Sequence, residues 1–539
     1  MIARHENPIE DRRQSIQAAL DAGRSAAARN RLGQFATPIA LAIEIAEYVQ
    51  SVAGDRLSAV RFADPAIGTG CFYSATLSVF GGDRIQSAVG VELDSAFCDA
   101  ARDLWSERGL DLVQGDFTRI VASSMRPVAP NLILANPPYV RHHHLGRGDK
   151  KRLQTLACQM AGVKVNGLAG LYVYFLLLAT AWMEDGGYAA WLIPSEFMDV
   201  NYGAALKRYL TEGVTLIRAH RFAPDDVQFG DALVSSVVLV FRKMVPLPVH
   251  AVEFTFGGTI REPRACDSIP LGILGESRKW TGFPRHAQND RRTSSVGHGP
   301  TLGDFFRIQR GIATGSNKFF VLARRDAERR RFPKRYLRPI LPSPRLLKTT
   351  VLESDRDGYP LTEPQLCVID CDLPEAVIQI RYPSLWEYLQ TAAELGIKDG
   401  YLVRKRTPWY RQEQRDSAPF LCTYMGRGSD EQQPFRFIWN HSQAIGTNVY
   451  LMLYPKNALA RMLRDHPDHA THVFALLGQL TGHELRGEGR VYGGGLNKIE
   501  PSELARVSAT AFVERWPTLR SAVQRQGELF GEGSGETGA

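Results

Sequence analysis

The chain has 539 residues, of which 44% are hydrophobic and 23% charged, and its formal net charge is +8. This composition is typical of a globular protein with roughly two to four domains. The positive charge favours an acidic partner such as nucleic acid, although many basic proteins bind nothing anionic. Composition alone therefore favours an acidic partner but does not identify a function.

The cysteines and the apolar segments exclude several classes of protein. Seven scattered cysteines do not form a disulfide framework, and no second pair accompanies Cys367 and Cys371 at zinc-site spacing. The N-terminus lacks the apolar core of a secretory signal, and the most apolar window, residues 168–183, is too short to span a bilayer. We therefore expect a cytoplasmic protein with free thiols and no membrane segment.

The first half of the chain has the pattern of an α/β fold. Residues 1–30 are polar and rich in Ala and Arg, which predicts a helical extension. From residue 31 to 245, short apolar runs alternate with helical patterns, as in a parallel sheet covered by helices. The predicted strands are residues 60–64, 87–92, 112–114, 132–135 and 188–193, followed by a hairpin of 215–221 and 235–242.

Three further segments follow this domain. Residues 246–300 are rich in Pro, Arg and Gly, which predicts a linker with little core of its own. Residues 301–512 mix short strands, turns and helices and are basic and aromatic in places, which predicts a second, α+β domain. Residues 513–539 are predicted to be a partly disordered tail.

The first predicted strand ends in a glycine-containing loop, FADPAIGTGCF, at residues 62–72. Gly68 and Gly70 would let backbone amides approach a ligand closely beyond the carboxyl end of the strand. The loop has neither the GxGxxG spacing of dinucleotide sites nor the lysine of a P-loop. Taken alone, it fits a cofactor site or a plain tight turn.

Acidic residues end the next two strands. Glu92 lies in VGVELD, where a carboxylate can accept hydrogen bonds from both hydroxyls of a ribose. Asp116, in QGDF, could accept a hydrogen bond from an adenine amino group while Phe117 lies against the ring. Each could instead be a helix cap or a solvated turn, but their order on three successive strands favours a nucleoside cofactor.

The fourth strand runs into Asn-Pro-Pro-Tyr within NLILANPPYVRHHH, residues 131–144. Prolines forbid continuation of the strand and remove two backbone donors. The amide of Asn136 is then expected to face outward, with an exposed aromatic residue, Tyr139, just beyond it. Such a turn is unfavourable unless the exposed groups face a ligand.

In this order, FADPAIGTG, GVELD, GDF and NPPY resemble the motifs of class I S-adenosylmethionine-dependent methyltransferases. GQFATP, residues 33–38, resembles a motif of gamma-class, TaqI-like DNA adenine-N6 methyltransferases of restriction–modification systems, where it lies near the methionine part of the cofactor. The resemblance implies a mostly parallel seven-stranded sheet with a terminal hairpin. The cofactor-binding residues that it implies are Phe35, Thr37, Asp64, Pro65, Ala66, Gly68, Gly70, Glu92, Asp116 and Phe117. Independently of the resemblance, Thr37 before Pro38 also predicts the N-cap of a helix at residues 39–49.

The resemblance assigns catalysis to Asn136, Pro137, Pro138 and Tyr139. The N6 lone pair of adenine is delocalised, and acceptors on the Asn136 side chain and the Pro137 carbonyl would draw the amine towards sp³ geometry. No dedicated general base is required. The base must leave the duplex, and Tyr139 would stack on one face of it, at about 1–3 kcal/mol. Phe229 would cover the other face, although an apolar anchor of the hairpin loop is the alternative.

Arg141 and the three histidines after it are predicted to contact phosphates or to lie in a loop that orders on DNA. Solvent exposure is the alternative. Consecutive histidines in an extended chain point to alternating sides and are poor chelators without further ligands, so we expect no metal site.

The second half of the chain is predicted to recognise the DNA sequence. Arginines and lysines among aromatic residues suit phosphate and guanine contacts, and a solvated basic face is the alternative. The candidates are Arg307, Arg310, Lys318, Arg404, Lys405, Arg406, Trp409 and Arg411. The stretches GIATGSNKFF and RVYGGGLNKIEP resemble elements of the C-terminal specificity domains of TaqI-like enzymes.

The leading hypothesis is a monomeric, sequence-specific DNA methyltransferase that transfers a methyl group from S-adenosyl-L-methionine to N6 of adenine in double-stranded DNA. Under about thirty residues precede the first motif, so any cognate restriction endonuclease is expected to be a separate chain. Cytosine N4 is the first alternative, because the same geometry suits another amine. RNA or protein-glutamine methylation and a non-catalytic DNA-binding role are the others.

Overall fold

The protein is described by a computed structural model over residues 8–120, 129–223, 226, 235–284, 299–427, 434–492 and 496–519. The chain divides into two compact units, the first made of residues 1–294 and 492–494 and the second of residues 295–491 and 495–539. At the N-terminus, α1 (Pro8–Ala22) and α2 (Ala26–Leu32) confirm the predicted helical extension.

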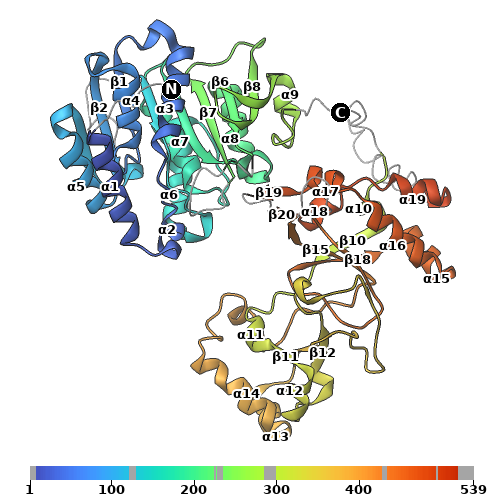
Figure 1. The fold of residues 1–539 in the computed structure, drawn as a ribbon. Coiled ribbons are helices and arrows are strands. Elements are labelled where there is room, and N and C mark those ends of the chain that lie inside the picture. The colour runs from blue at the N-terminus through green and yellow to red at the C-terminus, as the bar shows by residue number, and fades with distance from the viewer. Residues whose placement is uncertain are drawn as a thin grey trace, which may run out of the picture. The chain divides into compact units, whose positions relative to one another are not determined.

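A single mixed sheet forms the centre of the first unit (Figure 1). Its order over the described residues is β3-β2-β1-β4-β5-β7-β6-β8-β9. The strands from β3 to β5 are parallel, and β7 is antiparallel to both of its neighbours. The strands are β1 (Val60–Asp64), β2 (Ile85–Glu92), β3 (Leu110–Gln114), β4 (Leu132–Ala135), β5 (Tyr188–Pro194), β6 (Thr215–Arg221), β7 (Ser236–Arg242), β8 (Ala251–Gly258) and β9 (Pro263–Pro270). The predicted α/β fold with its late hairpin is confirmed, but over the described residues the sheet has nine strands rather than the seven expected.

Helices cover both faces of this sheet because successive strand residues point to opposite sides. Phe62 and Leu132 pack in one core cluster with α3 and α4, whereas Ala63 and Ile133 pack in another with α6 and α7. The helices are α3 (Ile39–Ala53), α4 (Cys71–Phe80), α5 (Ser95–Trp105), α6 (Arg147–Ala161), α7 (Leu171–Trp182), α8 (Ala204–Arg208) and α9 (Leu271–Glu276). The apolar window seen in the sequence is the buried helix α7. Within the described ranges, no helix has the length and apolar character needed to cross a membrane.

The predicted linker at residues 246–300 is wrong for its first part. Strand β8 pairs in parallel with β6, and β9 closes the sheet as an antiparallel edge strand. Trp280 is fully buried, its backbone N–H donates to the Met198 carbonyl at 3.0 Å, and its ring contacts Phe254. The segment therefore contributes to the core, and its polar composition reflects the exposed residues of an edge strand.

Three sheets make up the described part of the second unit. The five-stranded sheet has the order β10-β18-β15-β17-β13, and the two three-stranded sheets have the orders β11-β14-β12 and β16-β20-β19. Their strands are β10 (Phe306–Arg310), β11 (Val321–Ala323), β12 (Leu337–Ile340), β13 (Val351–Leu352), β14 (Leu366–Ile369), β15 (Phe420–Thr423), β16 (Met425–Arg427), β17 (Phe437–Asn440), β18 (Tyr450–Pro455), β19 (Arg490–Tyr492) and β20 (Leu496–Lys498).

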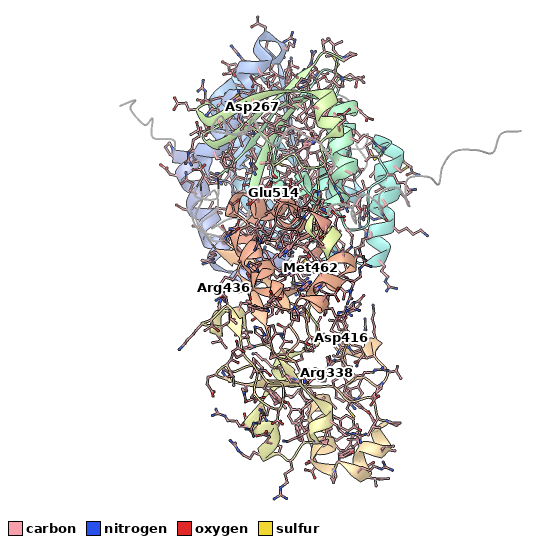
Figure 2. The ribbon with its side chains drawn as sticks, turned by 90° about the vertical axis from the view of Figure 1, so that its right-hand side faces the viewer. Asp267, Arg338, Asp416, Arg436, Met462 and Glu514 are labelled. Atoms are coloured by element: carbon pink, nitrogen blue, oxygen red, sulfur yellow. The ribbon has the colours of Figure 1, made fainter. Side chains whose placement is uncertain are left out.

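Short helices complete the second unit around two core clusters. They are α10 (Leu302–Phe305), α11 (Asn317–Phe320), α12 (Arg324–Arg329), α13 (Glu375–Arg381), α14 (Pro383–Glu394), α15 (Asn457–Asp465), α16 (His469–Gln479), α17 (Gly482–Glu488), α18 (Pro501–Leu504) and α19 (Thr510–Arg515). Some arginines of this unit hold the fold together: Arg436 donates to the Leu347 carbonyl at 2.9 Å, and Arg338 pairs with Asp370 at 3.1 Å. Figure 2 labels both arginines. A basic composition here is therefore partly structural.

Candidate active site

The loop after β1 is shaped by its own strand and by two glycines. Oδ1 of Asp64 accepts a hydrogen bond from the Ala66 N–H at 2.9 Å, beside the buried Pro65. Burial raises the pKa of Asp64 to about 8. Gly68 and Gly70 have φ of +55° and +88°, a region that side chains disfavour. A Cβ on Gly68 would meet nothing within 4 Å, so the backbone there is open to the close approach of a ligand.

The loop also contacts the end of β2. The Gly68 N–H donates to Oε2 of Glu92 at 3.0 Å, and the Asp94 N–H donates to Oε1 at 2.9 Å. Burial raises the pKa of Glu92. A carboxylate that is half-buried, fixed and beside an open glycine loop fits a group that accepts hydrogen bonds from ribose hydroxyls.

At the end of β3, Asp116 has mainly local partners. Its Oδ1 accepts from the N–H and the hydroxyl of Thr118, at 2.9 and 2.7 Å, and Oδ2 pairs with Arg119 at 3.1 Å. Phe117 is 3% exposed, and its ring contacts Phe175 and Trp182. Both residues lie at the same sheet edge as Glu92, and the adenine contacts assigned to them stay a prediction.

The orientation of the Asn136 side chain is fixed by the GQFATP segment. Nδ2 donates to the Phe35 carbonyl at 2.9 Å and to Oγ1 of Thr37 at 3.0 Å. A carbonyl can only accept, so the NH₂ group must face this segment and Oδ1 must face the other way. Within the described ranges, Oδ1 of Asn136 and the Pro137 carbonyl accept no hydrogen bond. The half-buried turn therefore presents two acceptors at the end of β4.

Tyr139 is not the exposed aromatic residue that the sequence predicted. It is 7% exposed, its hydroxyl donates to the Leu192 carbonyl at 3.1 Å, and its ring lies 5.4 Å from that of Phe35. Its N–H donates to the Gly33 carbonyl at 2.9 Å. The two prolines turn the chain back over the sheet, so the aromatic ring packs into the core with the half-exposed Pro138 before it.

The predicted capping role of Thr37 is also wrong. Helix α3 begins at Ile39 after Pro38, and no side chain caps it. The Thr37 hydroxyl contacts Asn136 instead, and the Thr37 carbonyl accepts from Sγ of Cys71 at 3.2 Å. The segment thus connects the turn after β4 with the start of α4, where the loop after β1 ends.

The histidines after Arg141 do not form an extended chain. His142–His144 make a 3₁₀ turn, in which the His144 N–H donates to the Arg141 carbonyl at 2.9 Å. Desolvation and the charge of Lys150 lower the pKa of His142. Arg141 is exposed beside this turn. No three possible ligands lie at metal-binding distance in the part of the chain that the structure describes.

Phe229 lies outside the described residues.

Three residues that the sequence reasoning missed support the site. A Cβ on Gly33 would lie 2.3 Å from the Tyr139 nitrogen, so only glycine fits there. Trp105 donates to the Thr69 carbonyl at 2.8 Å, and Arg13 donates to the Thr69 hydroxyl at 2.9 Å. Gly33 could have been found within GQFATP. Trp105 and Arg13 carry no local signal, because their partner is distant in the sequence.

Two predicted DNA contacts lie on the edge strand β10. Arg307 and Arg310 are exposed, with guanidinium carbons 4.3 Å from the Tyr454 ring centre and 3.8 Å from that of Tyr424. Lys498, from the RVYGGGLNKIEP stretch, lies 5.1 Å from the Tyr424 ring centre. These two distant stretches therefore meet at one aromatic ring.

The other predicted contacts come from two segments that lie together. A Cβ on Gly315 would lie 2.7 Å from Cγ2 of Val403, so the turn before Lys318 packs against the turn containing Arg404. The exposed side chains here are Lys318, Arg404, Lys405 and Arg411. Lys405 is held on Tyr401, with Nζ 2.6 Å from the hydroxyl and 3.9 Å from the ring centre.

Arg406 and Trp409 are placed differently from these four cations. Arg406 donates to the carbonyls of Ala313 and Thr314, and burial lowers its pKa. Trp409 is half-buried, and its indole N–H donates to Glu375 at 2.9 Å. Both residues hold the fold together, which leaves them little surface for DNA.

Comparisons with known proteins agree with this arrangement. Residues 131–228 match the family model "Eco57I restriction-modification methylase", and residues 279–531 match "Type II methyltransferase M.Eco57I, C-terminal domain". The type II methyltransferase M.XamI of Xanthomonas campestris pv. amaranthicola is 27% identical over 468 residues, which are 84% of this chain and 80% of the relative. M.AccI of Acinetobacter calcoaceticus is 24% identical over 496 residues, 88% of this chain and 85% of the relative.

A solved structure shares the fold. The type IIL restriction–modification enzyme MmeI in complex with DNA has a TM-score of 0.54 and 13% identity, over 97% of this chain and 79% of that one. At this identity the likeness concerns the fold alone. The shared fold and the two family matches agree with the geometry of the site, which has an open glycine loop and a fixed carboxylate. The chain is thus similar to Eco57I-type restriction–modification methylases and to type II methyltransferases, which supports a DNA methyltransferase whose methyl donor is S-adenosyl-L-methionine.

Proposed function

We propose that the protein methylates N6 of adenine at a specific sequence of double-stranded DNA, within a restriction–modification or related defence system. The observation that carries the proposal is the orientation of Asn136. Its NH₂ group donates hydrogen bonds to Phe35 and Thr37, so its oxygen is the group that can accept a hydrogen bond from a substrate. An acceptor suits an exocyclic amine, which has two protons to donate.

The two hydrogen-bond acceptors of the turn would make the main contribution to catalysis. Oδ1 of Asn136 and the Pro137 carbonyl would each accept a hydrogen bond from one N–H of the amine, which localises the nitrogen lone pair. The Asn136 amide is held by Phe35 and Thr37, and the Pro137 carbonyl belongs to the backbone, so little reorganisation is needed when charge develops on the nitrogen. S-adenosyl-L-methionine supplies an electrophilic methyl group on a sulfonium. The surplus proton can leave to solvent after transfer, so no general base is assigned.

The three strand ends would hold the cofactor. The open backbone at Gly68 suits close approach, Glu92 suits the ribose hydroxyls, and Asp116 with Phe117 suits the adenine. Phe35 and Thr37 would lie beside the methionine part, because they already contact Asn136, the group next to the reacting atom.

The target adenine would be flipped out of the duplex, because N6 is not accessible to this turn within a base pair. Tyr139 would stack on one face of the base and Phe229 on the other. Since Tyr139 is 7% exposed, only a small part of the ring surface is offered without rearrangement. We infer that substrate entry moves the residues that cover it.

The second unit would recognise the sequence. Exposed cations lie on the edge strand β10 and on the packed turns around Lys318 and Arg404. Exposed arginines and lysines supply phosphate contacts and contacts to guanine edges. Removing residues 301–539 should abolish sequence-specific binding, and specificity retained by the remaining chain would place recognition elsewhere. A separately encoded endonuclease would cut the same sequence when unmethylated, and the methyltransferase would act as a monomer, which sedimentation can test.

The test is methyl transfer by the full-length protein from labelled S-adenosyl-L-methionine to unmethylated duplex DNA, followed by nucleoside mass spectrometry. We expect N6-methyladenine, and single-molecule sequencing then gives the recognition sequence. N4-methylcytosine would change the assigned base while keeping the mechanism. Label found in RNA or protein, or in no product, would overturn the proposal.

A further inference from the structure

The N-terminal helix α1 is bonded directly to the loop proposed to hold the cofactor. Arg13 is 3% exposed and forms a two-pronged ion pair with Glu10, with Nη2–Oε1 at 2.7 Å and Nε–Oε2 at 2.9 Å. Its remaining nitrogen, Nη1, donates to the Thr69 hydroxyl at 2.9 Å. That hydroxyl in turn donates to Oε1 of Gln17 at 2.8 Å. Two residues one helical turn apart thus hold one loop side chain.

Thr69 is the part of the loop whose position matters most for a ligand, because it lies between Gly68 and Gly70. Glycines give the loop many alternative conformations, so a bound conformation must be imposed from outside. Thr69 is fully buried, with its hydroxyl held by α1 and its carbonyl held by Trp105. In a fourth contact, the Ser74 hydroxyl in α4 donates to Oε2 of Glu10 at 2.6 Å, so α1 is also bonded to the helix that follows the loop.

The N-terminal segment also contacts the turn that follows β2, through Arg24, which comes just after α1. Arg24 forms an ion pair with Asp94, and its guanidinium lies 5.1 Å from the Phe97 ring centre. The Asp94 N–H is one of the donors to Glu92. Arg24 also donates to Gln34 at 2.6 Å, just before Phe35. The segment therefore contacts the glycine loop, the turn after Glu92 and the GQFATP segment, which orients Asn136.

We infer that residues 8–32 are a clamp that sets the affinity of the site for S-adenosyl-L-methionine, with Arg13 and Arg24 as positioning residues. The inference rests on the cofactor site proposed above. Docking of the clamp holds Thr69 and Asp94 so that the Gly68 backbone and the Glu92 carboxylate face the ligand together. By reciprocity, cofactor binding must stabilise docking of the clamp by the same factor. A helix that only adds stability to the fold would show no such coupling.

The experiment compares cofactor affinity and clamp stability in the full-length protein. Arg13→Gln removes the bond to Thr69, and Glu10→Gln with Arg13→Gln removes it without leaving a buried charge unpaired. Arg12→Gln is the matched control, because Arg12 is exposed on the same helix. Calorimetric titration with S-adenosyl-L-methionine should give a Kd about 10-fold higher in both Arg13 variants and an unchanged Kd in the control.

Amide hydrogen exchange supplies a readout that is independent of these variants. In the unsubstituted protein, the cofactor should slow exchange across residues 12–20 by a factor similar to the change in Kd. A Kd within twofold of normal in the double variant, or exchange in α1 that does not respond to the cofactor, overturns the clamp. Failure of the unsubstituted protein to bind the cofactor at all is a different result, and it overturns the proposed cofactor site as well.

Discussion

The two units of the protein place the polar groups of their candidate sites in opposite ways. In the first unit, Asn136 and Glu92 are half-buried, follow strand ends, and are fixed by backbone donors and acceptors. In the second unit, Arg310 and Lys405 are exposed and rest on aromatic rings. Fixed and desolvated groups suit the stabilisation of a transition state, whereas exposed cations on aromatic supports suit attraction of a polyanion. Substitutions in the two units should therefore change different measured quantities.

The largest expected effect is on the rate of transfer. Asn136→Ala removes the side-chain acceptor, and we expect the transfer rate to fall by at least about 100-fold, as for loss of one group that stabilises developing charge. The Kd values for cofactor and DNA should stay within about threefold. Single-turnover kinetics with pre-bound DNA measures the rate separately from binding. Transfer at the normal rate would remove Asn136 from the mechanism.

The next effect concerns the second unit and should appear in binding. Arg404→Ala together with Lys405→Ala should lower DNA affinity about 10-fold near physiological salt and reduce the slope of log K against log salt by about two. The single-turnover rate on saturating DNA should not change. Arg406→Ala is the contrasting variant, because that residue binds backbone carbonyls, so it should lower the melting temperature instead. An unchanged salt slope in the double variant would place the phosphate contacts elsewhere.

A smaller effect tests how Asn136 is held. Thr37→Val removes one of the two acceptors of the Asn136 amide, and loss of a single hydrogen bond is expected to lower the transfer rate about 5-fold. Thr37→Ser keeps the hydroxyl and should stay near the normal rate. If Val and Ser behave alike, the hydroxyl does not orient the amide, and the contrast between fixed and exposed groups is weakened.

The smallest effect is on stability and comes from Asp64. Its pKa in the folded protein, about 8, lies above the ordinary 3.8, so between these values the folded state binds more protons than the unfolded state. The free energy of unfolding therefore falls as pH rises from about 4 to about 8 and stays lower above that range. Asp64→Asn should reduce the fall between pH 6 and pH 8 by an amount on the order of 1–2 kcal/mol. Urea unfolding measures it, with the exposed Asp83→Asn as control.

The central strands were predictable because parallel strands buried on both faces are short apolar runs. β1 and β4 were predicted with their observed bounds, and the residues at the ends of β1 to β4 come to one edge because parallel strands all end there. β9 was missed, because an edge strand exposes alternate residues such as Arg264 and Cys266 and has no continuous apolar run. Only its pairing with β8 makes it a strand.

The sequence by itself determined the order of the motifs, the polar residues at each strand end and the turn at Asn136, because these follow from short-range patterns of apolar, proline and glycine residues. The tertiary structure decided the rest. It buried Tyr139, used Thr37 to orient Asn136 rather than to cap a helix, and separated the exposed cations of the second unit from Arg406. Each outcome depends on a partner far away in the chain, and no local pattern records which distant groups will meet.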